Sequence, residues 1–111
     1  MIYFKPNYID EETEEFNALD GDELLGSCRL SYGKEPADVF QLSLASNDAY
    51  VGEGLLRAAF NFAANKGIYM GSCSADGVDF IVKKMNFEYK NGVYINDIPS
   101  ILMGSCCKFD K

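Results

Sequence analysis

The sequence predicts an α+β protein in which two helices cover a mostly antiparallel sheet. Two observations lead to this fold class. Short apolar and aromatic segments are separated by turn signals, of which the dipeptide Asp20-Gly21 is the clearest. Two other segments, at 51–66 and 76–85, carry apolar residues at helical spacing. Elements of these two kinds form layers, with the helices lying on the sheet.

Strands are expected on both sides of the first helix. Pro6 interrupts the first strand, which is therefore expected at an edge of the sheet. The strand that begins at Ala37 carries Val39, Phe40 and Leu42, and we expect it near the centre. The expected strands span residues 1–9, 11–19, 23–32, 37–45, 68–74, 87–95 and 101–107.

The segment 51–66 is the strongest helix prediction. Its polar residues are spaced by four and form a narrow stripe, so the rest of its surface is expected to pack on the sheet, with Phe60 and Phe62 buried. Residues 46–48 offer three candidate N-caps, and Gly67 is the expected C-cap. The polar stripe consists of Glu53, Arg57, Asn61 and Asn65.

Length and composition restrict the class of protein. A chain of 111 residues is expected to form a single domain over 1–111. A net charge of −7 argues against nucleic acid as a partner, because phosphate binding requires clustered Lys and Arg. There is no apolar run long enough to span a membrane and no basic segment followed by an apolar one, so we expect a cytoplasmic protein.

The sequence contains no histidine, which removes the commonest general base and metal ligand. None of the four cysteines forms a C-x-x-C pair, so neither a zinc site nor a thioredoxin-type redox site is expected. Free thiols in a reducing compartment are the simpler interpretation. The cysteines are Cys28, Cys73, Cys106 and Cys107.

Negative charge is concentrated in the first part of the chain. Residues 1–48 contain 11 acidic and 3 basic side chains, a net charge of −8, whereas residues 49–111 contain 6 and 7, a net charge of +1. Two interpretations remain open. The acidic part either keeps the protein soluble or attracts a cationic substrate or partner.

Gly52, Glu53 and Gly54 lie where the strand 37–45 passes into the helix. Glycines allow close approach of the backbone, and the first amides of a helix attract anions, so a pyrophosphate group would fit there. The alternative interpretation is a tight turn with close helix packing. The pattern matches neither the dinucleotide fingerprint nor the P-loop.

Three segments resemble a known family. Residues 52–59 with 65–67 are similar to a cofactor-binding helix, residues 80–87 to a conserved helix end, and residues 98–103 to a closing strand. Together, over about 27–106, the chain resembles the GNAT superfamily of N-acetyltransferases. The resemblance implies a splayed sheet, with the N-terminal part shortened because no room remains for the two helices usual there.

The resemblance also implies a cofactor and its contacts. Acetyl-CoA would lie in the split of the sheet, with its pantetheine arm along the strand that ends at Leu44 and Ala45. Its pyrophosphate would lie on the amides of Val51, Gly52, Glu53 and Gly54.

The sequence departs from the family pattern at several of these positions. Asn47 stands in place of a Gln or Arg of the phosphate loop, and Tyr50 in place of its first glycine. Asp48 and Glu53 add negative charge near the expected phosphates. The family's catalytic tyrosine falls on Val82.

The sequence is therefore consistent with two functions. The first is an acyl-CoA-dependent N-acyltransferase, with weak activity, that acts on a small cationic amine or a lysine-type amino group. The alternative is a catalytically inactive binding or regulatory module with the same fold, for which a homodimer is one arrangement. No catalytic residue is assigned. Tyr89 and Tyr94 are expected to be packing residues, and Cys73 and Ser74 lack a visible activating base.

Overall fold

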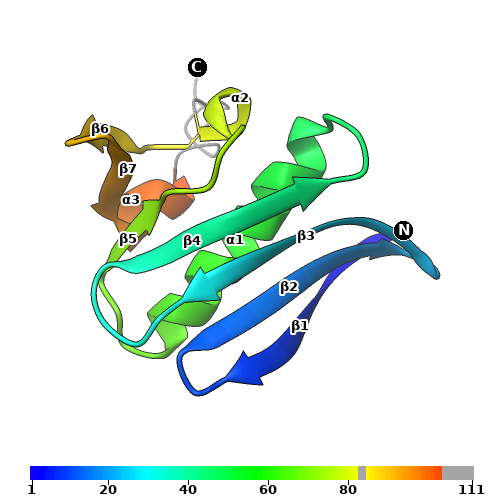
Figure 1. Ribbon diagram of the computed structural model, residues 1–111, viewed down its shortest axis with the longest axis horizontal. Coiled ribbons are helices and arrows are strands. Elements are labelled where there is room, and N and C mark those ends of the chain that lie inside the picture. Colours follow the sequence, from blue (N-terminus) through cyan, green and yellow to red (C-terminus); the bar gives the residue numbers. More distant parts are fainter. Residues whose placement is uncertain (83–84, 104–111) are drawn as a thin grey trace.

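Seven strands form one mixed sheet in the computed structural model, which describes residues 1–82 and 85–103. The order across the sheet is β1-β2-β3-β4-β5-β7-β6, and within the described residues only β4 and β5 pair in parallel. The strands are β1 (Ile2–Asp10), β2 (Thr13–Asp20), β3 (Glu23–Ser31), β4 (Ala37–Leu44), β5 (Met70–Cys73), β6 (Glu88–Lys90) and β7 (Val93–Asp97). The helices are α1 (Ala49–Asn65), α2 (Asp79–Val82) and α3 (Ile98–Met103), as Figure 1 shows.

The four strands expected before the first helix are confirmed, with ends shifted by one or two residues. They form an antiparallel meander in which β1 is the edge strand, as the proline within it predicts. Gly21 adopts a φ of 63° in the turn between β2 and β3, a backbone conformation that favours glycine.

Helix α1 crosses the sheet and supplies much of the core. It begins at Ala49, two residues earlier than expected, because Asp48 caps it by accepting a 2.9 Å hydrogen bond from the Tyr50 amide. Phe60 is fully buried, whereas Phe62 is only partly buried. The C-cap is Lys66, one residue before the expected Gly67, and Gly67 follows it with a φ of 86°.

The C-terminal part differs from the expected pattern. The segment 87–95 was expected to be one strand, but it is a hairpin, because Asn91 and Gly92 take left-handed conformations with φ values of 53° and 83°. The helix expected over 76–85 corresponds to α2 in the described residues, and residues 83 and 84 lie outside them. Cys106 and Cys107 lie outside the described residues.

The prediction of a strand over 101–107 is wrong for its described part. The prediction of a family-like closing strand over 98–103 is also wrong, because residues 98–103 form α3. The physical reason is local. The Asp97 carboxylate accepts a 2.8 Å hydrogen bond from the Ser100 amide, which caps a helix, and Pro99 is tolerated in its first turn.

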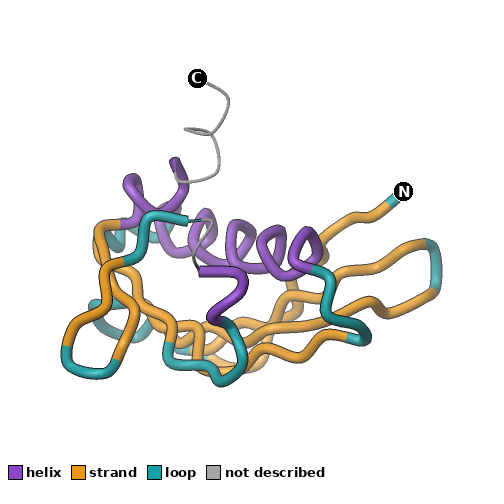
Figure 2. The backbone as a smooth tube through the Cα atoms, turned by 90° about the horizontal axis from the view of Figure 1, so that it is seen from above, coloured by secondary structure: helices purple, strands orange, loops and turns teal. Residues whose placement is uncertain are grey.

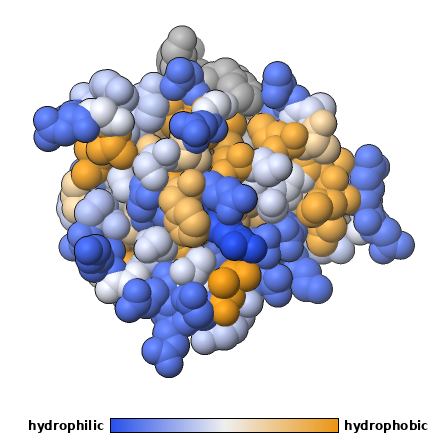
Figure 3. All heavy atoms as spheres, viewed as in Figure 1, coloured by the Kyte–Doolittle hydropathy of each residue, from blue (hydrophilic) through white to orange (hydrophobic). Residues whose placement is uncertain are grey.

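The two principal helices cover one face of the sheet. α1 packs on β2, β3 and β4, and α3 packs on β5 and β7, on the same side in Figure 2. In the described residues no helix precedes α1, and no helix covers the opposite face of the sheet (Figure 2). That face carries polar pairs such as Glu15 with Arg29, whose Oε2 and Nε lie 3.8 Å apart. Figure 3 shows it as a mixture of hydrophilic residues and apolar patches. Among the described residues, no helix has the length and apolar character needed to cross a bilayer.

A candidate cofactor site in the split of the sheet

The parallel strands β4 and β5 separate after three paired positions. Residues 37–39 pair with 71–73, after which β5 ends while β4 continues to Leu44 (Figure 1). The carbonyl of Val39 accepts hydrogen bonds from the amides of Ser74 and Ala75, at 3.0 and 3.2 Å, so the chain after β5 closes the inner end of this split. Within the described residues, the β4 edge over 40–44 has no strand beside it on the β5 side.

A bulge marks the start of the split. Gln41 pairs with Arg29 and Val39 pairs with Leu30, which leaves Phe40 as the extra residue of β4. A bulge changes the direction of the backbone at this point. It thereby helps the outer half of β4 to diverge from β5.

The N-terminus of α1 lies just after the free part of β4. The Ala45 amide still bonds to the carbonyl of Leu25 at 2.9 Å, and three residues later Asp48 caps the helix. The first amides of a 17-residue helix form an anion-binding end. The Asp48 carboxylate already occupies the Tyr50 amide, so an incoming phosphate would meet a negative charge.

The two glycines of the expected phosphate motif lie inside α1, where close packing explains them. A Cβ on Gly52 would lie 2.3 Å from Cδ1 of Ile81, and a Cβ on Gly54 would lie 2.1 Å from the Phe4 ring. These contacts agree with the alternative interpretation of the motif, close helix packing. The cofactor contacts of Gly52 and Gly54 stay predictions, as do those of Leu44, Ala45 and Val51.

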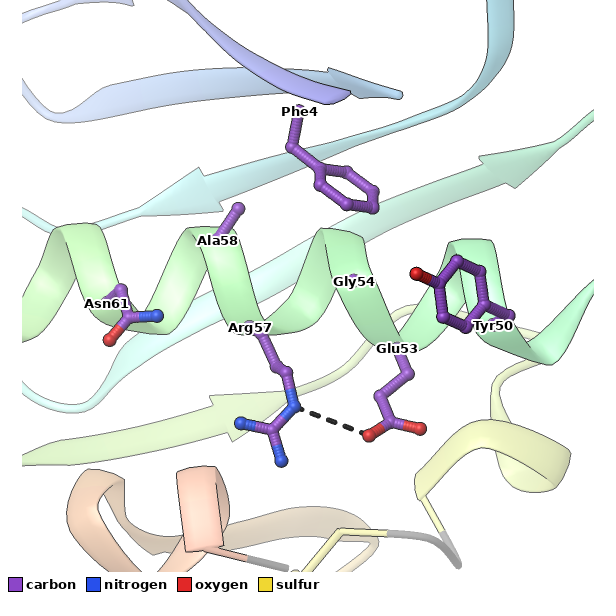
Figure 4. Close-up of a pocket in the computed structure, with 7 residues that line it drawn as sticks. All are labelled: Phe4, Tyr50, Glu53, Gly54, Arg57, Ala58 and Asn61. Carbon is purple, nitrogen blue, oxygen red and sulfur yellow. Dashed lines mark hydrogen bonds and ion pairs between the residues drawn. The ribbon is translucent and has the colours of Figure 1, made fainter. Parts of the chain in front are cut away.

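Glu53 lies on the outer side of α1, in the wall of a cavity of about 400 Å³. Its carboxylate accepts a 3.3 Å hydrogen bond from Nε of Arg57, one turn along the helix, so the guanidinium offsets the charge expected to repel phosphate. Figure 4 shows this pair and the Phe4 ring over Gly54. The cavity is lined by Phe4, Tyr50, Glu53, Gly54, Arg57, Ala58 and Asn61.

A second cavity, of about 350 Å³, opens where β5 ends. Burial raises the pKa of the Cys73 thiol to about 12, so this cysteine is not a poised nucleophile. The Ser74 hydroxyl donates a 2.6 Å hydrogen bond to Asp38, a carboxylate shared with Ser72. The lining consists of Cys73, Ser74, Ala75, Asp76, Gly77, Asp79, Tyr89, Gly92 and Tyr94.

The position expected for the family's catalytic tyrosine is part of the core. Val82 is only 3% exposed and has no proton to donate. A phenol does reach this region from another strand, because Oη of Tyr94 on β7 donates a 2.8 Å hydrogen bond to Asp79 at the start of α2. The sequence could not show this pair, because the two residues lie 15 positions apart on different elements.

Comparison with solved structures identifies the fold. The PaiA N-acetyltransferase of Thermoplasma acidophilum, solved in complex with coenzyme A, superposes with a TM-score of 0.62 at 20% identity, over 78% of this chain and 61% of that one. A protein of Desulfovibrio desulfuricans, described as an acetyltransferase of the GNAT family, superposes with a TM-score of 0.59 at 12% identity, over 78% of this chain and 70% of that one. The fold is GNAT-like.

Comparison of the sequence alone does not identify a family. No family model matches this chain, and no curated protein matches it either. This chain spans about three fifths of the length of the PaiA enzyme. The solved structures therefore establish the GNAT-like fold, and the splayed sheet with helices on one face agrees with the fold that the sequence predicts.

Proposed function

We propose that this protein is an acyl-CoA-dependent N-acyltransferase that uses acetyl-CoA as acyl donor. One observation carries the proposal. The edge of β4 is free over 40–44, and the chain then leads, through four residues, into the N-terminus of α1. An extended ligand can pair its amides with a free strand edge, and a phosphate can bind at the helix end that follows.

The residues of the split fit such a ligand in part. The edge that ends at Leu44 and Ala45 would pair with the pantetheine arm, and the first amides of α1, Val51 among them, would bind the pyrophosphate. Asp48 opposes this binding, so we expect a weak affinity. When bound, acetyl-CoA supplies a thioester that is reactive toward amines.

The proposed acceptor is a small cationic amine or a lysine-type amino group. Asp76 and Asp79 line the cavity at the end of β5, and the net charge of −8 over residues 1–48 attracts cations in general. The amine must lose a proton before it attacks, and a carboxylate acting through water is a suitable base in a chain without histidine. Backbone amides at the Phe40 bulge would stabilise the negative charge that develops on the carbonyl oxygen.

Because the chemistry consumes acetyl-CoA, we place the protein in the cytoplasm.

The charge of Asp48 provides a test of the cofactor site. Replacing Asp48→Asn keeps a good N-cap but removes the negative charge beside the proposed pyrophosphate. We expect titration calorimetry at low salt to show acetyl-CoA binding weaker than about 1 μM for the wild type. The variant should bind about fivefold more tightly, since one charge pair at about 4 Å in water is worth about 1 kcal/mol.

The control for this test is Glu11→Gln, which removes a charge in the turn at the other end of the sheet (Figure 1) and should leave the affinity unchanged. Equal gains in both variants would indicate a general charge effect and not a site at α1. Release of CoA should then be assayed with polyamines, amino acids and lysine peptides. Binding without any release of CoA would favour the inactive module, and no binding at millimolar acetyl-CoA would contradict the proposed site.

A further inference from the structure

We propose that a corner between the end of α1 and the strands β2 and β3 binds a methylated ammonium group, whose place the Lys66 ammonium takes in this structure. Glu14 of β2, Tyr32 just after β3 and Phe62 of α1 form this corner, which we call the aromatic corner. In Figure 1 it lies where α1 ends near the turn between β1 and β2. The 17 residues of α1 rise about 1.5 Å each, so Lys66 is about 25 Å from the helix N-terminus, and the inference is independent of the proposed function.

Two aromatic rings form the walls of the corner. The centroids of Tyr32 and Phe62 lie 5.1 Å apart, and the ring planes are inclined by 78°, so the two rings stand almost at a right angle. Phe16 packs edge-on against Phe62 at 5.6 Å and supports it from the sheet. Tyr32 and Phe62 are only partly buried, so ring surface remains open to a ligand. Perpendicular rings of this kind offer a cation two sites of negative charge density.

The Lys66 ammonium stands in the open side of this corner. Its Nζ lies 5.2 Å from the centroid of Phe62 and 6.0 Å from that of Tyr32, at the outer limit of a cation–π contact. Among the described residues this ammonium has no hydrogen-bond or ion-pair partner. Its N–H donors are therefore left to water, which holds a compact primary ammonium strongly. A methylated ammonium is larger and has fewer N–H groups to hydrate, so it suits two ring faces better.

Glu14 supplies a negative charge to the corner. It alternates with Phe16 and Ala18 on the helix-facing side of β2 and is only 7% exposed. Its carboxylate accepts no hydrogen bond and forms no ion pair within residues 1–82 and 85–103. In the same part of the chain no fully enclosed side-chain oxygen lacks a partner, so the oxygens of Glu14 must open to the surface. A buried carboxylate that opens outward without a partner is suited to receive a cation.

The register of the sheet brings this carboxylate beside the Tyr32 ring. Glu14 pairs with Leu30, so Tyr32, two residues further along the chain, is its diagonal neighbour on the same face. The Tyr32 amide donates a 2.8 Å hydrogen bond to the carbonyl of Glu12, which extends the pairing to this residue. A Cβ on Gly33 would lie 2.6 Å from the carboxyl carbon of Glu12, so a second carboxylate is next to the corner.

The electrostatics of Tyr32 agree with this arrangement. Burial raises the pKa of its phenol, and the charge of Glu14 is the next cause, which requires that the carboxylate and the phenol lie close together. Tyr8, Asp10 and Glu11 raise this pKa further. The corner therefore presents a neutral phenol in a negative field, and such a field attracts cations.

A simple surface contact of Lys66 with two rings does not account for Glu14. Burial of a carboxylate without a hydrogen bond costs free energy, and an amide or apolar side chain would fill the same space at lower cost. The ammonium of Lys66 contacts the rings and does not form an ion pair with Glu14. A cationic ligand that contacts the rings and the carboxylate together would use all three groups.

Titration of the ligand-free protein with choline, followed by ¹³C NMR of the aromatic rings, tests the proposal. We expect saturable shifts of the Tyr32 and Phe62 signals with a Kd on the order of 1 mM, because exposed cation–π contacts are individually weak. The alcohol 3,3-dimethyl-1-butanol has the shape of choline without its charge. It should cause no saturable shift of either ring.

Two variants separate the carboxylate from the internal competitor. Glu14→Gln keeps the shape of the side chain and should weaken choline binding about fivefold, the effect of one charge at about 4 Å in water. Glu15→Gln is the matched control, because this neighbour pairs with Arg29 on the other face of the sheet, and it should leave the affinity unchanged. Lys66→Ala removes the competing ammonium and should tighten binding about two- to fivefold. Melting curves should show all three variants folded.

The same titration identifies the source of the methylated ammonium group. Tighter binding of a peptide that contains trimethyllysine would assign the group to a protein side chain, and tighter binding of choline would assign it to a small molecule. The absence of saturable ring shifts with either probe, in the wild type and in Lys66→Ala, would overturn the proposal. Equal binding of the neutral alcohol would overturn it too, as would equal losses in Glu14→Gln and Glu15→Gln. No CoA is present in these experiments, so their failure leaves the proposed transferase function standing.

Discussion

Truncation of Phe60 to Ala should lower the free energy of unfolding by about 3–5 kcal/mol, the usual cost of removing a buried aromatic ring. Phe60 has no exposed surface, and its ring lies between α1 and the sheet. It packs edge-on against Phe87 at 5.9 Å, and a Cβ on Gly71 of β5 would lie 2.6 Å from it. Urea denaturation followed by circular dichroism measures the change.

Phe62→Ala is the matched comparison. This ring lies two residues away on the same helix, is only partly buried, and makes edge contacts with Phe16 and Tyr32 at 5.6 and 5.1 Å. Its truncation should cost about half as much, because it removes less buried apolar area. Equal losses for the two variants would contradict the packing of α1 described above.

The thiol of Cys73 should resist alkylation in the folded protein. Burial raises its pKa from 9.0 to about 12, which lowers the thiolate fraction at neutral pH about a thousandfold, and the thiolate is the form that reacts. Treatment with iodoacetamide at pH 8, followed by peptide mass spectrometry, should leave Cys73 unmodified in the native protein and modified in urea.

Cys28 is the internal control for this measurement. It is also buried, burial again raises its pKa, and its sulfur lies 3.7 Å from the Leu55 carbonyl oxygen, so it should be protected equally. Rapid native labelling of Cys73 with Cys28 protected would show that the cavity at the end of β5 exposes a reactive thiol, contrary to the structure.

Local patterns were sufficient to predict most of the fold. The strands of the meander and helix α1 follow from apolar spacing, turn residues and caps that lie within a few positions of one another. The hairpin at Asn91 and Gly92 carried a local signal too, but the surrounding apolar residues suggested one continuous strand. Helix α3 depends on the Asp97 cap, which competes with the β-branched pattern around Ile98 and Ile101.

The site could be predicted only in outline. The split depends on where β5 stops pairing with β4, which joins residues more than 30 positions apart. The close neighbours of Gly52 and Gly54 are Ile81 and Phe4, which lie far away in the sequence. Contacts of this kind follow from tertiary packing, which periodicity and spacing do not encode.

The most direct test of the account is a titration of the ¹⁵N-labelled protein with CoA, followed by the backbone amide signals in two-dimensional NMR. We expect the largest shifts at residues 40–51, the free edge of β4 and the N-terminus of α1. Shifts confined to Phe4, Arg57 and Asn61, which line the cavity on the outer side of α1, would contradict it, as would the absence of any shift at millimolar CoA.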